Sequence, residues 1–355
     1  MAEKVLVAMS GGVDSAAAAL LLKRAGHEVA GITLRLYDAA PAATRTCCSP
    51  TALAEAAAFA AAIGVPHYVF DFREAFRAAV IDDFVAEYRR GRTPNPCVRC
   101  NHIVKFDLLL GRVRAMGFDA LATGHYVRRL AAPDGWALAR AADRAKDQSY
   151  FLWGIPRAAL PTLRFPVGEL QKAEVRRVLA EVAPVAAAKA ESQDVCFIED
   201  GDLRAFLARA CPDAFAPGLI VDEDGATLGR HAGIATFTVG QRRGLGVAGS
   251  GRLYVKSLDA AANTVTLAPA ASLAGRGFRL EDANWLVDRP ARATSVLVMI
   301  RYRDPGAAAT LTPAGDGGYE VRFNIPRRAI APGQSAAFFD GERLLGGGII
   351  AAVTA

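Results

Sequence analysis

The sequence predicts an α/β fold with a parallel sheet in the first two hundred residues, followed by a smaller β-rich part. Three observations predict it. Strand-like and helix-like segments alternate up to about residue 200, a glycine turn joins the first strand to the first helix, and helical periodicity largely disappears from about residue 216. Strands separated by helices form right-handed βαβ units whose parallel sheet is covered on both faces.

The first strand, turn and helix form the most informative stretch of the chain. Apolar residues 5–9 predict a strand, Ser10-Gly-Gly-Val-Asp-Ser15 a tight turn, and residues 16–25 a helix that Gly26 closes. Backbone N–H groups at a helix N-terminus face an incoming anion, and glycines let the backbone approach a phosphate closely. Ser10 and Ser15 offer hydroxyls, and Asp14 offers a magnesium contact. No Walker-type lysine follows, and the turn resembles the pyrophosphate-binding loop of ATP pyrophosphatases; a plain glycine turn is the alternative.

The following segments complete the predicted parallel sheet. Strands are predicted at residues 29–37, 67–72 and 119–123, and helices at 51–63, 74–89 and 103–116. The last strand runs into Thr123-Gly124-His125. In a parallel α/β sheet ligands bind beyond the carboxyl ends of the strands, where this tripeptide and Ser10–Ser15 are both expected.

The second half of the chain reads as short strands. They are predicted at residues 235–239, 253–257, 264–267, 294–301, 319–323 and 348–353. Asp340-Gly341 between residues 336–339 and 343–345 is a strong hairpin signal. The pattern indicates a small barrel or sandwich near the C-terminus, and we expect domains at residues 1–212, 213–278 and 279–355, the second mainly β.

Composition limits the class of protein. Charged residues make up 22% and hydrophobic ones 52% of the 355 residues, no segment resembles a signal peptide, and no apolar run of about 18 residues occurs. We therefore expect no membrane span and a cytoplasmic protein. The net charge of +6 is compatible with nucleic acid binding. Six cysteines in a cytosolic chain favour thiol chemistry or a metal over structural disulfides.

Three further segments contain residues suited to chemistry. Residues 91–101 hold two prolines, two asparagines and the pair Cys97-x-x-Cys100 in a basic setting, residues 146–152 begin with Lys146-Asp147-Gln148, and residues 191–198 place Cys196 after a polar stretch. Together with the first loop, these segments resemble the tRNA-specific 2-thiouridylase (MnmA-type) family. The resemblance extends to residues 236–244, 301–303 and 331–349, so it covers nearly the whole chain.

The resemblance implies an adenine nucleotide α-hydrolase-like (PP-loop) domain, and it gives roles to the matching positions. ATP would contact Ala8, Met9, Ser10, Gly11, Gly12, Val13, Asp14, Ser15, Leu34 and Gly124. The target base would lie against Asn95, Pro96 and Cys97. The tRNA would be touched by His125, Lys146, Asp147, Gln148, Arg301, Tyr302 and Gln334. Cys100 would be the nucleophile, Cys196 would carry the persulfide, and the two would form a disulfide during catalysis.

The implied reaction replaces the C2 oxygen of the anticodon wobble uridine with sulfur. ATP with Mg²⁺ would adenylate that oxygen and make AMP the leaving group. The sulfur would come from a cysteine persulfide supplied by a sulfur-relay protein or a cysteine desulfurase. The expected partners are the lysine, glutamate and glutamine tRNAs, and the protein is expected to be a monomer.

One position departs from the family pattern. Many members have Asp-x-x-Cys where this chain has Cys97-Val-Arg-Cys100, and a thiol with a free pKa near 8.5 matches an acid/base role poorly. Either Cys97 is a spare thiol, or Cys97, Cys100 and Cys196 hold an iron–sulfur cluster. A zinc site at the Cys-x-x-Cys and a simply buried Cys196 are the structural alternatives. The functional rivals are another ATP pyrophosphatase and a non-catalytic RNA-binding protein.

Overall fold

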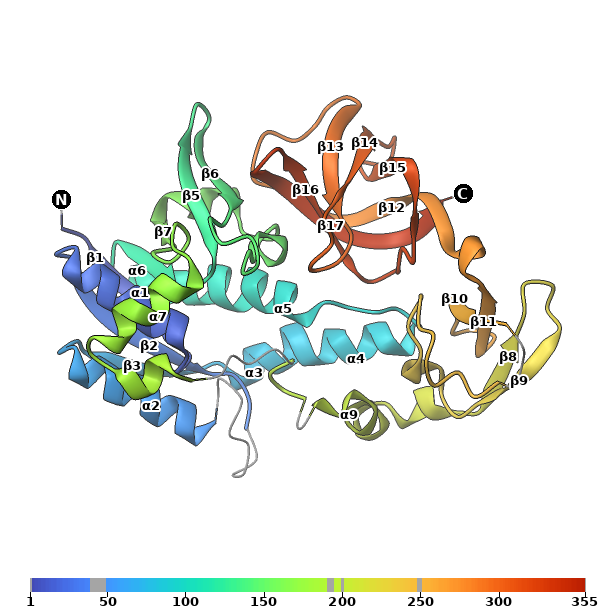
Figure 1. Cartoon of the computed structure of the whole chain (residues 1–355), viewed down its shortest axis with the longest axis horizontal. Coiled ribbons are helices and arrows are strands. Elements are labelled where there is room, and N and C mark those ends of the chain that lie inside the picture. Colours follow the sequence, from blue (N-terminus) through green and yellow to red (C-terminus); the bar gives the residue numbers. More distant parts are fainter. Residues whose placement is uncertain (1, 39–48, 190–194, 199–200, 248–250, 355) are drawn as a thin grey trace. The chain divides into compact units, whose positions relative to one another are not determined.

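The computed structural model describes residues 2–38, 49–189, 195–198, 201–247 and 251–354. They group into two compact units (Figure 1). The first contains Met1–Val80, Cys97–Gly201 and Glu342–Leu345, and the second contains Ile81–Pro96, Asp202–Gly341 and Gly346–Ala355. The domain boundaries expected near residues 212 and 278 stay predictions.

The first unit is built on a five-stranded parallel sheet, which confirms the predicted fold class. The strand order is β3-β2-β1-β4-β7, and Ala8 at the end of β1 lies opposite Ile32 of β2 and Thr123 of β4. The strands are β1 Lys4–Ala8, β2 Glu28–Arg35, β3 His67–Asp71, β4 Ala120–Thr123 and β7 Leu163–Arg164. The loops that follow β1 and β4 therefore begin at neighbouring positions on one edge of the sheet.

Helices α1 Val13–Arg24, α2 Pro50–Ala62 and α7 Lys172–Ala180 pack in one hydrophobic cluster with β1 and β4. The four alanines at residues 16–19 of α1 are all buried. Small side chains let a helix approach the sheet closely, which fixes the start of α1 against the ends of the strands. The short α8 Pro184–Ala187 packs against α7.

Two longer helical segments contain π-helical turns. Residues 73–89 form α3 Arg73–Phe76, a π segment Arg77–Ile81 and α4 Asp82–Arg89, as predicted for 74–89. Residues 96–115 form α5 Pro96–Arg99, a π-helix Cys100–Leu108 and α6 Leu109–Ala115. The prediction that this helix begins at residue 103 is wrong, because Pro96 occupies the first turn, where a missing N–H costs no hydrogen bond.

A hairpin that the sequence reading did not include follows β4. It consists of β5 Val127–Ala132 and β6 Gly135–Arg140, and Arg343 and Leu344 of the first unit pair antiparallel with β6. Arg343 also forms an ion pair with Asp134 in the hairpin turn, at 2.7 Å. Short 3₁₀ turns at Ser149–Phe151 and Arg157–Thr162 lead to β7.

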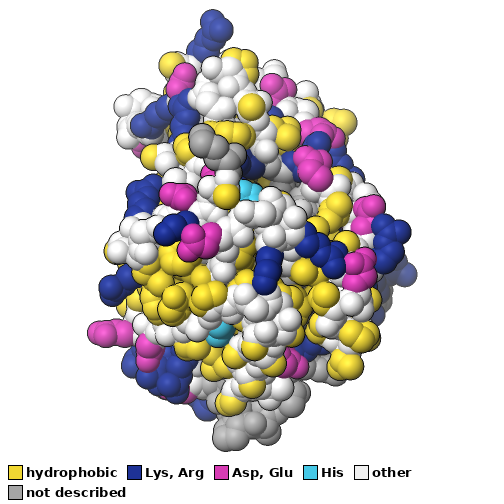
Figure 2. All heavy atoms as spheres, turned by 90° about the vertical axis from the view of Figure 1, so that its left-hand side faces the viewer, with side chains coloured by type: hydrophobic (Ala, Val, Ile, Leu, Met, Phe, Trp, Pro, Cys, Tyr) yellow, Lys and Arg dark blue, Asp and Glu magenta, His cyan; other side chains and the backbone are white. Residues whose placement is uncertain are grey.

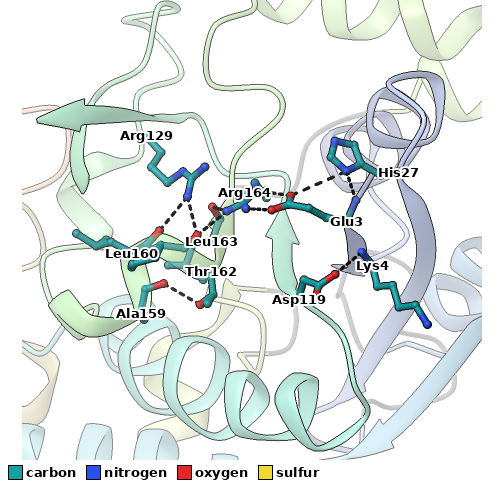
Figure 3. A network of polar contacts seen from close by, with 11 residues as sticks. Glu3, Lys4, His27, Asp119, Arg129, Ala159, Leu160, Thr162, Leu163 and Arg164 are labelled. Carbon is teal, nitrogen blue, oxygen red and sulfur yellow. Dashed lines mark hydrogen bonds and ion pairs between the residues drawn. The ribbon is translucent and has the colours of Figure 1, made fainter. Parts of the chain in front are cut away.

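The amino ends of β1 and β4 carry a polar network (Figure 3). Arg164 of β7 donates to Glu3 and, at 2.7 Å, to the Pro161 carbonyl. The Glu3 N–H donates to His27 Nδ1 at 3.2 Å, and the Lys4 N–H donates to Asp119 Oδ2 at 2.8 Å. The network therefore links the starts of the sheet strands at the edge opposite the loop Ser10–Ser15.

The second unit contains a small mixed sheet and a closed barrel. The sheet has the order β10-β11-β8-β9, and β12, β15, β14, β13, β16 and β17 close a six-stranded barrel through the pairing of β12 with β17. Both are visible in yellow to red in Figure 1. Their elements are α9 Leu203–Ala210, a 3₁₀ turn Pro212–Phe215, β8 Gly218–Val221, β9 Thr227–His231, β10 Leu253–Asp259, β11 Thr264–Pro269, a 3₁₀ turn Ala270–Leu273, β12 Ala274–Trp285, β13 Thr294–Met299, β14 Ala307–Pro313, β15 Tyr319–Arg328, β16 Ser335–Asp340 and β17 Arg343–Thr354.

The predicted hairpin at Asp340-Gly341 is confirmed, whereas the strand predicted at residues 235–239 is wrong. Ile234–Thr236 form a 3₁₀ turn instead. Gly233 precedes it with a φ of 155°, and a Cβ there would lie 2.7 Å from the Phe215 backbone. Phe237 is buried in the small sheet's core with Val255 and Val265. An apolar run can fill a core from a turn as well as from a strand.

None of the helices in the described ranges combines the length and hydrophobicity that crossing a bilayer requires. Figure 2 views the molecule from the left of Figure 1 and shows basic and acidic side chains interspersed among hydrophobic ones. The positive net charge is therefore not gathered into a single field on this face.

Candidate active site

The loop between β1 and α1 is held by its own serines and by close backbone contacts. Ser15 Oγ accepts a hydrogen bond from the Ser10 N–H at 3.2 Å and donates to the Gly12 carbonyl at 3.1 Å. Gly11 has a φ of +70°, and a Cβ there would lie 2.6 Å from the Ala52 carbonyl oxygen at the start of α2. Only glycine, which has no Cβ, fits this close approach of the loop to α2.

The apolar residues predicted to contact ATP are buried next to the loop Ser10–Ser15. Met9, Val13 and Leu34 are buried, and the Met9 N–H donates to the Ile32 carbonyl at 2.7 Å. Thr33 Oγ1 donates to the Met9 carbonyl at 2.9 Å and contacts His67 Nε2 at 2.8 Å. Burial lowers the pKa of His67, which favours the neutral imidazole beneath the loop.

The carboxylate of Asp14 has two partners that sequence reasoning missed. Tyr126 OH donates to Asp14 Oδ1 at 2.8 Å, and Lys172 Nζ donates to the same oxygen at 2.7 Å. Within the described ranges no donor to Asp14 Oδ2 is found. Asp14 Oδ2 is a hard oxygen ligand, which fits the magnesium contact expected for Asp14.

A second lysine of the first unit, Lys189, also contacts the loop although it lies far from it in the sequence. Lys189 Nζ donates to the Gly11 carbonyl at 3.3 Å and forms an ion pair with Glu55 of α2. The loop itself has no lysine, but Lys172 and Lys189 supply two cations there. A positively charged residue at the first position of a helix, as Lys172 is in α7, could have drawn attention to it in the sequence.

The tripeptide after β4 lies against the same loop. A Cβ on Gly124 would lie 2.6 Å from the Ser15 nitrogen, so Gly124 packs directly on the first turn of α1. His125 Nδ1 contacts Thr123 Oγ1 at 2.8 Å, and its ring packs on Phe106. Burial, with the nearby charge of Lys105, holds the pKa of His125 well below its ordinary value. The ring is therefore neutral at neutral pH.

Residues 146–148 join the nucleotide loop through Tyr126. Gln148 Oε1 accepts from the Tyr126 N–H at 2.9 Å, and the Gln148 N–H donates to the Tyr126 carbonyl at 2.9 Å. Asp147 accepts from the Ala141 N–H at 3.0 Å and from Ser149 Oγ at 2.8 Å. The segment expected to touch tRNA is thus also part of the frame that holds Asp14.

The two cysteines expected to react belong to segments that both contact α3. Phe197, next to Cys196, packs edge-on against Phe76 of α3 with ring centroids 5.9 Å apart, and Tyr37 OH donates to the Cys196 carbonyl. α3 also packs against the π-helix that starts at Cys100. Cys100 is buried, Cys196 partly buried and Cys97 exposed, and residues 191–194 lie outside the described residues.

The described residues contain no cluster of three His, Cys, Asp or Glu suited to a metal ion. Cys97, Cys100 and Cys196 are all among those described.

In the second unit, Gln334 forms a hydrogen bond with the segment just before the residues expected to contact the target base. Gln334 Nε2 donates to the Thr93 carbonyl at 2.8 Å, and the Thr93 N–H donates to the Pro332 carbonyl at 2.9 Å. Gln334 thereby holds the backbone just before Asn95 and Pro96.

Arg301 and Tyr302 lie in a turn after β13, not on a strand face. Asp304 Oδ1 accepts from the Gly306 N–H at 3.0 Å and from Arg327 at 2.6 Å, and its side chain is fully buried. Arg303 has a φ of 64°, and its guanidinium lies over the Tyr302 ring at 5.5 Å. The turn presents exposed Arg301 and Arg303 while Asp304 fixes its shape.

Comparison with known proteins finds family models and relatives that together match nearly the whole chain. Three family models match, described as a tRNA methyl transferase HUP domain at residues 3–200, a tRNA methyl transferase PRC-barrel domain at 204–269 and an aminomethyltransferase beta-barrel domain at 275–350. Among solved structures, NMN synthetase from Francisella tularensis matches with a TM-score of 0.34 and 16% identity, covering 53% of this chain and 65% of its own.

Curated relatives match over almost the whole length. The tRNA-specific 2-thiouridylase MnmA of Magnetococcus marinus is 47% identical over 98% of this chain and 99% of its own. That of Chloroflexus aurantiacus is 46% identical over 98% of both chains, and that of Methylobacterium radiotolerans is 48% identical over 99% of this chain and 94% of its own. The chain therefore belongs to the tRNA-specific 2-thiouridylase family, whose members are tRNA-uridine 2-sulfurtransferases.

Proposed function

We propose that this chain thiolates tRNA at the wobble uridine, using ATP to activate C2 and a persulfide on Cys196 as the sulfur source. The observation that carries the proposal is the common neighbour α3. Phe76 of α3 contacts Phe197 beside Cys196, and α3 packs on the π-helix that begins at Cys100. Both thiols therefore belong to the unit that holds the loop Ser10–Ser15, as a reaction joining nucleotide and sulfur chemistry requires.

In the proposed first step, the uridine C2 oxygen attacks the α-phosphate of ATP and releases pyrophosphate. Backbone N–H groups at the start of α1 would bind the phosphates. Asp14 would hold Mg²⁺, which stabilises the charge that develops on the phosphate oxygens. The uridine oxygen then leaves later as part of AMP.

In the second step, the terminal persulfide sulfur of Cys196 attacks C2, and AMP leaves. The Cys100 thiolate then attacks the Cys196 sulfur. This breaks the bond to the transferred sulfur, leaves that sulfur on the base and forms a Cys100–Cys196 disulfide. A reductant must reopen the disulfide before the next turnover, and a sulfur-relay protein or a cysteine desulfurase must reload Cys196.

The iron–sulfur route through Cys97, Cys100 and Cys196 is less well supported. Cys97 is exposed whereas Cys100 is buried. A cluster needs its three thiolates gathered on one side of the metal, and the described residues include no such group. We therefore retain the persulfide route.

We further propose that tRNA contacts both units, the first through residues 146–148 and the second through Arg301, Tyr302 and Gln334. Asn95, Pro96 and Cys97 would lie against the target base. The lysine, glutamate and glutamine tRNAs are the expected substrates, and the chain would act on them in the cytoplasm as a monomer.

The test is incubation of the purified chain with unmodified tRNA, ATP, Mg²⁺ and a persulfide donor. Nucleosides are then analysed by mass spectrometry, and released pyrophosphate is measured. We expect a 2-thiouridine derivative together with AMP and pyrophosphate. Pyrophosphate release without a thiolated base would favour another ATP pyrophosphatase, and ADP with inorganic phosphate would contradict the proposed use of the loop.

A further inference from the structure

Strand β15 of the barrel contains a wide bulge on the side that faces β12. β15 pairs with β12 up to Arg322 and again from Arg327, so residues 323–326 lie opposite Arg276 of β12. Within this stretch Asn324-Ile325-Pro326 are all exposed, and we call these three residues the β15 bulge. A bulge interrupts the ladder and turns side chains in a new direction.

The tip of the β15 bulge is apolar. Ile325 is 75% exposed, and among the large hydrophobic residues that the structure describes only Val185 is more exposed. Pro326 extends the apolar surface, and its ring restricts the backbone. A side chain in this position adds little to the barrel core, so its apolar area is available to a binding partner.

The residues that follow the β15 bulge are anchored within the second unit. Arg327 donates to Asp304 Oδ1 at 2.6 Å, and Asp304 is buried in the turn after β13. The Arg328 guanidinium lies over the Tyr254 ring, 5.2 Å from its centroid. These contacts define the position of the bulge before a partner binds, which lowers the entropy cost of binding.

Exposed arginines flank the apolar tip. Arg322 precedes the β15 bulge and Arg328 follows it, and both are exposed. Among the described residues, no acidic side chain forms an ion pair with either of them. The ion pair of Asp304 also connects the bulge to the turn that presents exposed Arg301 and Arg303.

The acidic side chains of this part of the barrel lie at the other end of β15. Glu320 lies opposite Arg279 of β12, and Asp316, in the turn before β15, forms an ion pair with the same arginine. The surface around the β15 bulge therefore combines positive charge with an apolar tip. This combination matches RNA, in which phosphates flank the apolar faces of unstacked bases.

We propose that the β15 bulge is a further tRNA contact of the second unit. Ile325 packs against an unstacked base or its ribose, and Arg322 and Arg328 bind the neighbouring phosphates. This inference rests on the proposed binding of tRNA to the turn that contains Arg301. The apolar contact adds affinity that salt does not screen, whereas the arginines add affinity that salt weakens.

The test is filter binding of an unmodified tRNA transcript over a range of salt concentrations. Ile325→Ser removes the apolar tip, Ile325→Leu keeps it, and Arg322→Gln removes one charge. Val185→Ser is the matched control, because Val185 lies on α8 of the first unit and is 88% exposed. Thiolation is assayed at increasing tRNA concentration, once with a small-molecule persulfide donor and once with a cysteine desulfurase. Thermal unfolding checks that each variant folds.

We expect Ile325→Ser to bind tRNA about 10-fold more weakly with an unchanged salt slope, since no charge is lost. Its KM for tRNA should rise while kcat stays unchanged, and Ile325→Leu and Val185→Ser should match wild type. Arg322→Gln should reduce the salt slope by about 0.7 to 0.9, the value for one phosphate contact.

The proposal is overturned if Ile325→Ser binds tRNA like wild type, or if Arg322→Gln leaves the salt slope unchanged. Loss of thiolation by Ile325→Ser with the desulfurase alone, at wild-type tRNA affinity, would overturn it in favour of a protein contact. Wild-type chain that binds no tRNA would contradict the proposed function as well.

Discussion

Cys97, Cys100 and Cys196 differ in their surroundings, and the proposed chemistry assigns them different tasks. Cys100 is buried at the start of a π-helix, and Cys196 is partly buried beside Phe197. We expect Cys100→Ser and Cys196→Ser each to abolish thiolation while tRNA-dependent pyrophosphate release persists, since adenylation uses neither thiol. The measurement pairs nucleoside mass spectrometry with a pyrophosphate assay.

Cys211 provides the control for these variants. It is buried in the second unit, its Sγ donates to the Leu207 carbonyl at 3.2 Å, and burial raises its pKa. Such a thiol is unreactive, so Cys211→Ser should retain thiolation. Loss of pyrophosphate release in Cys100→Ser, with tRNA binding intact, would contradict the separation of the two steps.

Cys97 distinguishes the two sulfur routes. In the persulfide route this exposed thiol has no required task, so Cys97→Asp, which restores the common family pattern, should retain or raise thiolation. A hard carboxylate replaces a thiolate poorly in an iron–sulfur cluster. The protein should be purified without oxygen and assayed for iron, sulfide and thiolation. Stoichiometric iron in wild type, together with an inactive and iron-free Cys97→Asp, would overturn the persulfide route.

His125 should remain neutral where most histidines titrate. Its pKa is depressed in the folded chain, chiefly by burial and then by Lys105, whereas the unfolded value is near 6.5. The unfolded chain therefore binds a proton first, and stability present above about pH 6.5 is lost as the pH falls. NMR titration, with His125→Gln for assignment, should find a neutral ring at pH 6. A charged imidazole at that pH would contradict the prediction.

At this scale the sequence predicts the loop residues well and their partners poorly. Ser10–Ser15 follow a recognisable strand and precede a recognisable helix. Tyr126 and Lys172 meet Asp14 from 112 and 158 positions away. No local pattern fixes such contacts, because they depend on how the sheet strands are ordered.

Among the elements, β7 depends on a polar network at the sheet edge opposite the loop. Hydrogen bonds that Arg164 donates to Glu3 lower the pKa of the Glu3 carboxyl. Both side chains are partly buried. We expect Arg164→Met to lower the free energy of unfolding by about 1 kcal/mol at neutral pH, because water screens part of the ion pair. Chemical denaturation at several pH values measures it.

The pH dependence of that loss has a definite sign. The stabilisation is complete above the unfolded glutamate pKa of about 4.3 and disappears as the pH falls through the lower folded value. The difference between wild type and Arg164→Met should therefore shrink below about pH 4. Arg24→Met is the control, since its ion pair with Glu181 is more exposed. A constant difference at all pH values would assign the loss to packing instead.

The sequence predicts elements where the pattern is local. The parallel strands and the Asp340-Gly341 hairpin have clear signals. The hairpin β5–β6 is stabilised by pairing with Arg343 and Leu344, which lie far along the chain from their partners Ala139 and Leu138. Residues 235–239 have strand-like composition but are bent by Gly233. Tertiary packing decides both cases, so propensity alone could not.

For the whole molecule, the two units are interleaved along the chain. Ile81–Pro96 belong to the second unit although the first unit surrounds them in sequence, and Glu342–Leu345 belong to the first. α4 buries Phe84 and Tyr88 within the second unit, where Phe84 packs on Phe206. A truncation after residue 278 would remove the partner of β6 as well as the barrel. Single substitutions are therefore the cleaner probe of tRNA binding.

Because the net charge is +6, the salt dependence of tRNA binding is the quantity to measure in such a variant. Binding to tRNA releases counterions, so the logarithm of the association constant falls linearly with that of the salt concentration. Arg301 is exposed on a turn whose carboxylate, Asp304, is occupied by Arg327, so it is available to a phosphate. Arg301→Gln should weaken binding and reduce the salt slope by about 0.7 to 0.9, the value for one phosphate contact.

Arg289→Gln is the control, because Arg289 donates to Tyr319 OH at 2.8 Å within the barrel. This variant should leave the salt slope unchanged. Filter binding over a range of salt concentrations measures both, and an unaltered slope in Arg301→Gln would show that the turn after β13 does not contact the tRNA backbone.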